Sequence, residues 1–436
     1  MSGRWTRREL LAAGAWAGAG LAAGRAMAWD APLTGDWSEP LGLGLEVSGR
    51  AGLELPAWGS GEESASSQTV LMFRGNPSHT FYGTGPVPDR PELLWSSRLA
   101  SFPTTLRGKP VTWAGTGWTG QASKLGRWVF VGGQGCVLYA FDADSGEVGW
   151  RFRAERMFKS SLCVYENRIY IGNVDDHLYC VDARTGKLVW RYNTGDDCDS
   201  SPCVYQDKVY VCGEAGFAHC LEPRTGAVHW KAFVGGIGPG TKPGSNGSET
   251  SPAVDDGEMY LANYHGEVKC LDARTGQQRW VTQTGDDTDA SVVVLGDRIY
   301  AAAEAGSPKV FCFDRAGGRE VWSRSNGAGW WSTPAVVGER LYIGGHDGVF
   351  YCLDARDGAE VWRFEVGASV WSSPVVVEDK VIFGSLGSKV LMLEAESGRL
   401  IWEVGVQGGC FSTPCVVDGR IYVGSSGGVF YCFGRG

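Results

Sequence analysis

The chain of 436 residues carries a formal net charge of −9, and it is rich in glycine (65 residues) and tryptophan (19 residues). Residues 1–28 contain four Arg and one Glu, so the remainder of the chain is more acidic still. This charge balance argues against nucleic acids and anionic membrane surfaces as partners.

Residues 1–28 have the features of an export signal. The twin arginines Arg7 and Arg8 precede an apolar run rich in Ala and Gly, and Ala26-Met27-Ala28 has the small residues of a cleavage site. The apolar run is shorter than the ~20 residues of a membrane span. We therefore expect a cleaved twin-arginine signal peptide and no membrane span in the mature chain. Residues 29–68, rich in Gly, Ser, Glu and Pro, are predicted to be a linker.

The remainder, residues 69–436, repeats with a period of about 40 residues. A segment such as TGKLVW ends each unit, and these segments end at Trp150, Trp190, Trp230, Trp280, Trp322, Trp362 and Trp402, with an eighth, PELLW, at Trp95. Within a unit, β-branched and aromatic runs are separated by turn sequences such as QDK, GEAG and PRTG. This pattern predicts four short antiparallel strands per unit and an all-β protein.

Four-stranded units at this spacing predict a β-propeller, because a radial array leaves only short, protected edges. The inner three strands recur eight times, beginning near Pro110, Ser161, Pro202, Pro252, Ser291, Pro334, Pro374 and Pro414. The outer strand with its Trp follows only seven of them. We therefore predict eight blades, the last of which is closed by the N-terminal strand around Trp95.

The Trp and Cys columns are predicted to be structural. The repeat Trp residues are expected to pack between blades. Six of the 13 Cys share one repeat column in the third strand, namely Cys180, Cys220, Cys270, Cys312, Cys352 and Cys432. Residues of one column in neighbouring blades should lie too far apart for a disulfide bond. We expect buried free thiols.

The repeat unit, as in LYCVDARTGKLVW and FYCLDARDGAEVW, resembles that of the pyrroloquinoline-quinone-like (PQQ-like) β-propellers. This resemblance covers residues 69–436 and implies the eight-bladed fold. The family contains quinoprotein dehydrogenases and the non-enzymatic propellers of outer-membrane assembly, so the resemblance alone does not decide the activity. The chain has no adjacent Cys-Cys pair, no C-x-x-C-H haem motif and no inserted lobes, which places it closer to the non-enzymatic type.

The residue that heads each inner strand should lie in a ring around the mouth of the central channel. In order these residues are Arg107, Lys159, Asp199, Glu249, Asp289, Trp331, Trp371 and Phe411. Cations, carboxylates and aromatic residues occupy separate sectors of this ring, whereas the neighbouring S/T-S/T-P positions repeat. We interpret the ring as a ligand-binding site. The alternative is a solvated or salt-bridged rim.

Two repeated motifs add acids to the ring, TGDDCD with Asp196 and Asp197, and TGDDTD with Asp286 and Asp287. Such oxygen donors suit a hard cation such as Ca²⁺. The spacing does not match a known calcium loop, and Asp is a common loop residue. We therefore predict no metal site. The histidines at 177, 265 and 346 fall in turns on the same face, in different blades, and are expected to act singly.

Two insertions interrupt the repeat. Residues 235–252 (GGIGPGTKPGSNGSETSP) lengthen the connection that leads to Glu249 by ten residues, and we expect this loop to lie over the channel mouth. Residues 113–128 (WAGTGWTGQASKLGRW) are predicted to lengthen the first turn of blade 1. This places them on the opposite face, as a plug of the channel or a partner site.

The sequence predicts an exported, non-enzymatic binding or scaffold module of the periplasm or cell envelope, with no catalytic residues and no cofactor. Its expected partner is an envelope protein, a peptide or a small ligand at the channel mouth. The alternative is a dehydrogenase that uses PQQ and calcium to oxidise an alcohol or sugar. The resemblance implies that Arg107 would then lie near the quinone oxygens, that Asp199 would act as the base, and that Trp331 would stack on the quinone.

Overall fold

The structure, a computed structural model, describes residues 47–49, 52–55, 69–106, 109–117, 120–236, 247–304 and 308–436. These residues contain strands and turns but no helix, and hence no helix that could cross a membrane. The signal peptide predicted for residues 1–28 lies outside the described residues.

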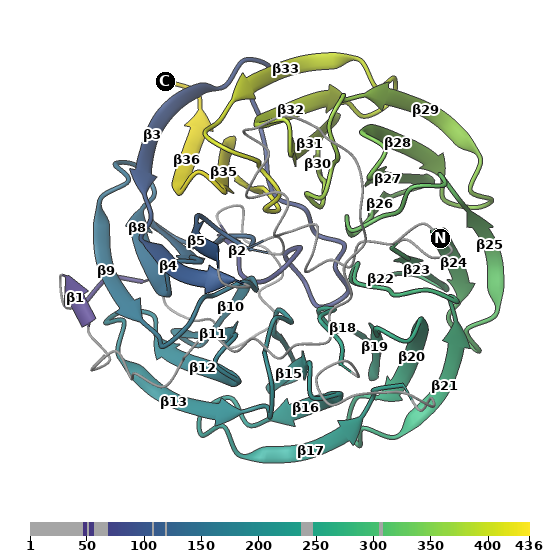
Figure 1. Cartoon of the computed structure of the whole chain (residues 1–436), viewed down its shortest axis with the longest axis horizontal. Coiled ribbons are helices and arrows are strands. Elements are labelled where there is room, and N and C mark those ends of the chain that lie inside the picture. Colours follow the sequence, from purple (N-terminus) through teal and green to yellow (C-terminus); the bar gives the residue numbers. More distant parts are fainter. Residues whose placement is uncertain are drawn as a thin grey trace.

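Eight sheets radiate from a central axis, as Figure 1 shows. Within blades 2 to 7 the strands run from the axis outward in chain order. Blade 2 comprises β10 (Leu162–Tyr165), β11 (Arg168–Asn173), β12 (His177–Asp182) and β13 (Leu188–Asn193). Blade 3 comprises β14 (Cys203–Tyr205), β15 (Lys208–Gly213), β16 (Phe217–Leu221) and β17 (Val228–Phe233). Blade 4 comprises β18 (Ala253–Asp255), β19 (Glu258–Ala262), β20 (Glu267–Asp272) and β21 (Gln278–Gln283). Blade 5 comprises β22 (Val293–Leu295), β23 (Arg298–Ala302), β24 (Val310–Asp314) and β25 (Glu320–Arg324). Blade 6 comprises β26 (Ala335–Val337), β27 (Arg340–Gly344), β28 (Val349–Asp354) and β29 (Glu360–Glu365). Blade 7 comprises β30 (Val375–Val377), β31 (Lys380–Ser385), β32 (Lys389–Glu394) and β33 (Leu400–Gly405).

The eighth blade is built from both ends of the chain, as predicted. Strands β34 (Cys415–Val417), β35 (Arg420–Ser425) and β36 (Val429–Gly434) are followed in the sheet by β3 (Glu92–Arg98). The ladder between β3 and β36 is antiparallel and places Trp95 opposite Cys432. The ring is therefore closed by backbone hydrogen bonds between distant parts of the chain.

Blade 1 differs from the prediction. Its four radial strands are β6 (Ser123–Leu125), β7 (Trp128–Gly132), β8 (Val137–Asp142) and β9 (Val148–Arg153). Pro110 lies instead in a separate hairpin of β4 (Ser101–Leu106) and β5 (Lys109–Ala114), so the prediction that the inner strand begins near Pro110 was wrong. The alternating residues of β5 imitate a blade strand. Residues 113–128 therefore do not lengthen the first turn of blade 1; β6 itself lies within them and turns directly into β7.

The repeat tryptophans pack between blades. Trp95, Trp150, Trp190, Trp230, Trp280, Trp322 and Trp362 each donate a hydrogen bond from Nε1 to a backbone carbonyl of the next blade, at 2.9–3.1 Å. The turn beneath each indole has a glycine. Gly186, for example, has φ +72°, and a Cβ there would lie 2.8 Å from the ring of Trp150. The column thus joins neighbouring blades by packing and by one directed bond.

All thirteen cysteines are buried and none forms a disulfide bond. Burial raises the pKa of the Cys163 thiol to about 12, and the Cys180 pKa rises to about 12 for the same main reason. A thiol with a raised pKa is mostly protonated at neutral pH and is a poor nucleophile. These cysteines therefore act as small apolar core residues, as predicted.

Residues 69–84 cross the centre of the propeller, where Figure 1 shows β2 (Thr69–Val70). Inner strands of a propeller present unpaired backbone groups toward the axis, and this segment satisfies them. Beyond the β2–β6 pairing, its bonds are Val164 N to Leu71 O, Val254 N to Pro77 O, Val294 N to Ser78 O, Val336 N to the Tyr82 hydroxyl, and Thr84 N to Val416 O. The central segment thus connects most of the blades.

Arg74 is the polar centre of this segment. It is fully buried, and its guanidinium donates to the carbonyl oxygens of Thr333 at 3.1 Å, Pro334 at 2.9 Å and His79 at 3.3 Å. The guanidinium carbon also lies 4.7 Å from the centre of the Tyr82 ring. Burial lowers the pKa of His79 to about 3, so this imidazole is neutral at physiological pH.

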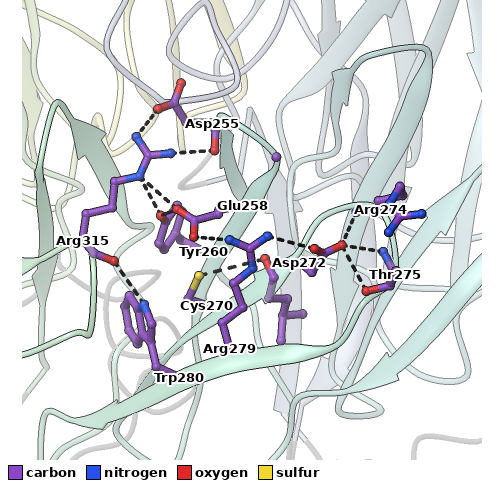
Figure 2. A network of polar contacts seen from close by, with 12 residues as sticks. Asp255, Glu258, Tyr260, Cys270, Asp272, Arg274, Thr275, Arg279, Trp280 and Arg315 are labelled. Carbon is purple, nitrogen blue, oxygen red and sulfur yellow. Dashed lines mark hydrogen bonds and ion pairs between the residues drawn. The ribbon is translucent and has the colours of Figure 1, made fainter.

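Blades 4 and 5 are joined by an additional ion-pair network. Arg315 takes the position at which most blades carry a small alanine, and its backbone carbonyl accepts from Trp280 Nε1. Figure 2 shows its guanidinium reaching across the seam to Asp255 Oδ2, 2.5 Å from Nη1, and to Glu258 Oε2, 3.1 Å from Nε. The Arg315 side chain is only 17% exposed, so the network is a partly buried clamp between two blades.

Candidate functional site

The ring positions are fixed by a hydrogen-bond ladder around the axis. From blade 1 to blade 7, a backbone N–H in each inner connection donates to the side-chain hydroxyl of the equivalent residue in the next blade at 2.9–3.1 Å. The residues of this ladder are Gln121, Ser161, Ser201, Ser251, Ser291, Thr333 and Ser373. A ring residue lies two positions before each hydroxyl residue. Because the ladder repeats with constant geometry, it presents these side chains at equivalent places in successive blades.

The structure describes seven of the eight predicted ring residues: Lys159, Asp199, Glu249, Asp289, Trp331, Trp371 and Phe411. The ladder places Gln121 where blade 2 has Ser161. Arg107, the ring residue predicted for blade 1, lies outside the described residues.

A second ring of side chains, from the turns between the second and third strands, accompanies the first. Its members follow the ring residues by fifteen positions and are Val174, Glu214, Tyr264, Glu304, His346, Leu386 and Ser426. Glu214, Tyr264 and Glu304 were missed by sequence reasoning. The constant spacing was the signal that could have found them, since the two positions meet in blades 3 to 6.

The acids of blades 3 and 5 form two equivalent triads. In blade 3 the carboxylates of Asp197, Asp199 and Glu214 each offer an oxygen within 4.8 Å of the others. Blade 5 repeats this with Asp287, Asp289 and Glu304, again within 4.8 Å. Four of these six residues are buried. The repeated TGDD motifs thus contribute one part of each triad, and the second ring contributes the other.

The same part of the ring contains a third acidic cluster and a carboxylate that accepts a hydrogen bond from a tyrosine. Asp176, Asp196 and Asp197 form a third, half-buried cluster in blades 2 and 3. In blade 4, Tyr264 donates a hydrogen bond to Glu249, and burial followed by the nearby Glu214 raises the pKa of the Tyr264 hydroxyl. We define the acidic sector as the ring residues and acids of blades 3 to 5.

Lys159 borders the acidic sector and is bound to it. Its Nζ lies 2.5 Å from Asp199 Oδ2, and the two side chains are 15% and 1% exposed. Burial lowers the pKa of Lys159, but the charges of Asp199 and Asp197 raise it by more, so the ammonium stays charged. The pair ties blade 2 to blade 3 at the ring.

Blades 6 to 8 carry the aromatic sector. Trp331 and Trp371 lie with ring centres 4.2 Å apart, and the His346 ring meets Trp331 edge-on at 5.0 Å. Phe411 belongs to the same cluster, and Leu386 packs against it. These aromatic side chains are packed against one another rather than spread as separate surface residues.

Two other predictions concern loops and histidines. Residues 237–246, most of the insertion predicted to lie over the mouth, are outside the described residues. Just before this gap, the backbone carbonyl of Gly235 accepts a hydrogen bond from Lys269 Nζ at 3.2 Å. The metal-compatible groups among the described residues include no histidine, so His177, His265 and His346 do not share such a group.

The amino-acid sequence matches the family model described as outer membrane protein assembly factor BamB, over residues 88–324, 308–385 and 346–434. The chain belongs to this family. The predicted PQQ-like propeller resemblance is thereby confirmed. No curated protein matches the chain.

Solved structures similar to this BamB-family chain include BamB and dehydrogenases. BamB from Moraxella catarrhalis is 19% identical with a TM-score of 0.62, and the alignment covers 79% of this chain and 100% of that one. A europium-containing methanol dehydrogenase is 16% identical (TM-score 0.69; 85% and 98% covered), and the quinohemoprotein alcohol dehydrogenase of Comamonas testosteroni is 17% identical (TM-score 0.66; 86% and 82% covered). At these identities the likeness establishes the fold alone.

Proposed function

We propose that this BamB-family propeller is a non-enzymatic binding module or scaffold, exported to the periplasm or cell envelope, that holds its ligand at the channel mouth. The ligand is an envelope protein, a peptide or a small molecule. The observation that carries the proposal is the division of the two rings into an acidic sector on blades 3 to 5 and an aromatic sector on blades 6 to 8.

Closure of the propeller does not require this division of the rings into sectors. The hydroxyl ladder of blades 1 to 7 and the tryptophan column already connect the blades, and they use nearly the same residues in successive blades. Ring side chains chosen only for closure would be expected to repeat in the same way. Side chains that differ by sector, on a rigid and uniform frame, are typical of recognition sites.

The position of the central segment favours the channel mouth as the binding site. Residues 69–84 occupy the axis and satisfy backbone groups of the inner strands, with Arg74 fully buried among them. A ligand would have to break several of these hydrogen bonds to enter from that side. The ring side therefore offers the less costly approach.

The alternative, a quinoprotein dehydrogenase, requires the residues to fit a quinone. Asp199, the expected base, is buried against Lys159, and Trp331, the expected stacking residue, packs against Trp371 and His346. Arg107 lies outside the described residues. The described groups are thus engaged with one another and do not fit the quinone roles, and we derive no step through that cofactor. The carboxylate triads do supply the oxygen donors that Ca²⁺ takes.

The deciding experiment is a titration of the purified mature protein with pyrroloquinoline quinone and Ca²⁺, followed by absorption and by dye-linked oxidation of alcohols and sugars. We expect no stoichiometric quinone binding and no dye reduction. A bound quinone spectrum together with alcohol-dependent dye reduction would overturn the proposal.

A second measurement tests the mouth directly. The photo-crosslinking residue benzoylphenylalanine replaces Phe411 in the ring or, as a control, the exposed Phe233 on the outer strand β17. We expect irradiation in cells to give discrete adducts from position 411 that are absent at 233. Identical adduct patterns at the two positions would contradict binding at the mouth.

A further inference from the structure

The outer edge of blade 1 carries a fifth radial strand that the other described blades lack. Strand β1 (Val47–Gly49) pairs with β9 in an antiparallel ladder that places Gly49 opposite Trp150. Figure 1 shows β1 outside β9, at the periphery of the disc. An outer strand presents unpaired backbone groups and is a template for strand addition. Residues 47–49 and 52–55, called the strap here, lie within the interval predicted to be a linker.

The edge of blade 1 is shaped for this strand by two glycines. The residue before the repeat tryptophan is Gly149 in blade 1, whereas the other blades carry Val189, His229, Arg279, Val321, Val361, Ile401 and Leu94. A Cβ on Gly49 would lie 2.2 Å from the carbonyl oxygen of Gly149. A Cβ on Gly149 would lie 2.6 Å from the Trp128 ring and 3.1 Å from Leu53 Cδ2. The close approach of the two backbones therefore requires glycine on both sides.

The strap is anchored beyond the ladder. Leu53 is 6% exposed and joins the core cluster that contains Trp150, and its backbone N–H donates to Arg184 O of blade 2 at 2.9 Å. Trp128 Nε1 donates to the Glu54 carbonyl at 3.1 Å. As a result Trp150 is fully buried, whereas the equivalent Trp190 in blade 2 is only partly buried.

We propose that the outer edge of blade 1 is a strand-acceptor site for an extended peptide, and that the strap is the ligand that this chain itself supplies. The site recognises the peptide backbone through the β9 ladder. It accepts glycine where the strap crosses Gly149, and leucine within the core cluster that contains Trp150. These are the elements of peptide recognition by strand addition, with backbone bonds for affinity and side-chain contacts for specificity.

Covalent connection explains why the strap occupies the site in the intact chain. Residues 56–68 link it to the central segment, and a short linker gives an effective concentration of roughly millimolar. A free peptide at micromolar concentration should therefore compete poorly with the strap. Emptying the site by changing the strap, and not the blade, should make it available.

The test uses the full chain and a fluorescein-labelled peptide with the sequence of residues 45–57. In the emptied variant, Gly49→Val/Leu53→Asp, the strap can neither approach Gly149 nor bury an apolar side chain in the core cluster that contains Trp150. We expect the peptide to bind this variant at least about tenfold more tightly than wild type. Adding Gly149→Val to the emptied variant should abolish binding, although valine is the residue that blades 2, 5 and 6 carry at this position.

Controls separate a binding site from general unfolding. The same peptide with Gly49→Val should not bind to the emptied variant. Melting midpoints show whether each variant is folded. If the double variant is unfolded, the single variant Leu53→Asp replaces it in the binding assay. Acrylamide quenching of tryptophan should rise in the emptied variant and fall again when the peptide is added. Absence of peptide binding to a folded emptied variant, or equal binding with Gly149→Val, overturns the proposal.

Discussion

Trp95 and Cys432 lie opposite each other in the ladder between β3 and β36, near the two ends of the propeller sequence. The Trp95 ring packs against Phe141, Tyr422 and Phe430, and its Nε1 donates to Ala143 of blade 1 at 2.9 Å. One side chain thus joins the closing strand to the last and the first blade.

Trp95→Ala should lower the free energy of unfolding by about 3–5 kcal/mol, because it removes a buried aromatic side chain from the closing seam. Trp402→Ala is the matched control in blade 7, where the indole is only partly buried, and its cost should be smaller. Urea unfolding of both variants provides the measurement. Equal losses of unfolding free energy in the two variants would show that the closing seam contributes no more to stability than the seam at blade 7. Deleting residues 1–98 is a less specific test, because it also removes the central segment.

Arg74→Met should destabilise the protein by about 2–4 kcal/mol, because three buried carbonyl oxygens lose their donor. The control is Arg98→Met, which removes an exposed arginine bonded to Gln407 and should change the unfolding free energy by less than about 0.5 kcal/mol. Thermal and urea unfolding measure both. A folded Arg74→Met protein with wild-type stability would contradict the role assigned to the central segment.

Lys159→Met should cost about 3–5 kcal/mol, because Asp199 then remains buried beside other carboxylates without its cation. The double variant Lys159→Met/Asp199→Leu should recover most of this loss. Lys389→Met, which breaks an exposed pair with Glu403, is the control and should cost less than about 1 kcal/mol.

The same pair makes a prediction about pH. The pKa of Lys159 is raised in the folded state, so its stabilisation is fully present below the usual lysine value of 10.5 and is lost only as pH rises through the folded value. The stability difference between wild type and Lys159→Met should therefore not fall between neutral pH and about pH 9. A decline in that interval, measured by urea unfolding, would refute the assignment.

Arg315→Ala should destabilise the protein by about 1–3 kcal/mol. Alanine is the residue that most other blades carry at this position, but it leaves Asp255 and Glu258 without the clamp. Arg298→Ala breaks an exposed pair with Asp297 in the same blade and should cost less. Equal costs for the two variants would mean that the clamp of Figure 2 contributes no more than a surface pair.

The clamp also predicts acid sensitivity. Burial raises the pKa of Glu258, but hydrogen bonds from Tyr260, Arg315 and Arg279 lower it by more, so the folded-state pKa is below the usual 4.5. Stabilisation from a carboxylate with a lowered pKa is present above the usual value and is lost as pH falls through the folded value. The difference between wild type and Arg315→Ala should therefore shrink below about pH 4.5 in unfolding curves taken across the acid range.

The sequence by itself determined the eight blades, the column of packing tryptophans, the closing strand around Trp95 and the ring positions from Lys159 to Phe411. Each of these depends on contacts that recur in every repeat, so the period records them. The order of strands within a blade follows from hydrophobic alternation and turn residues, which are local properties.

Only the tertiary structure decided the features that occur once. The register of blade 1 follows from the bond between Gln121 and Ser161, and the hairpin that contains Pro110 imitates a blade strand in sequence. The central segment and the strap satisfy backbone groups of strands that are distant in sequence. Backbone hydrogen bonds place little constraint on residue type, so such contacts leave no period and no motif from which they could be predicted.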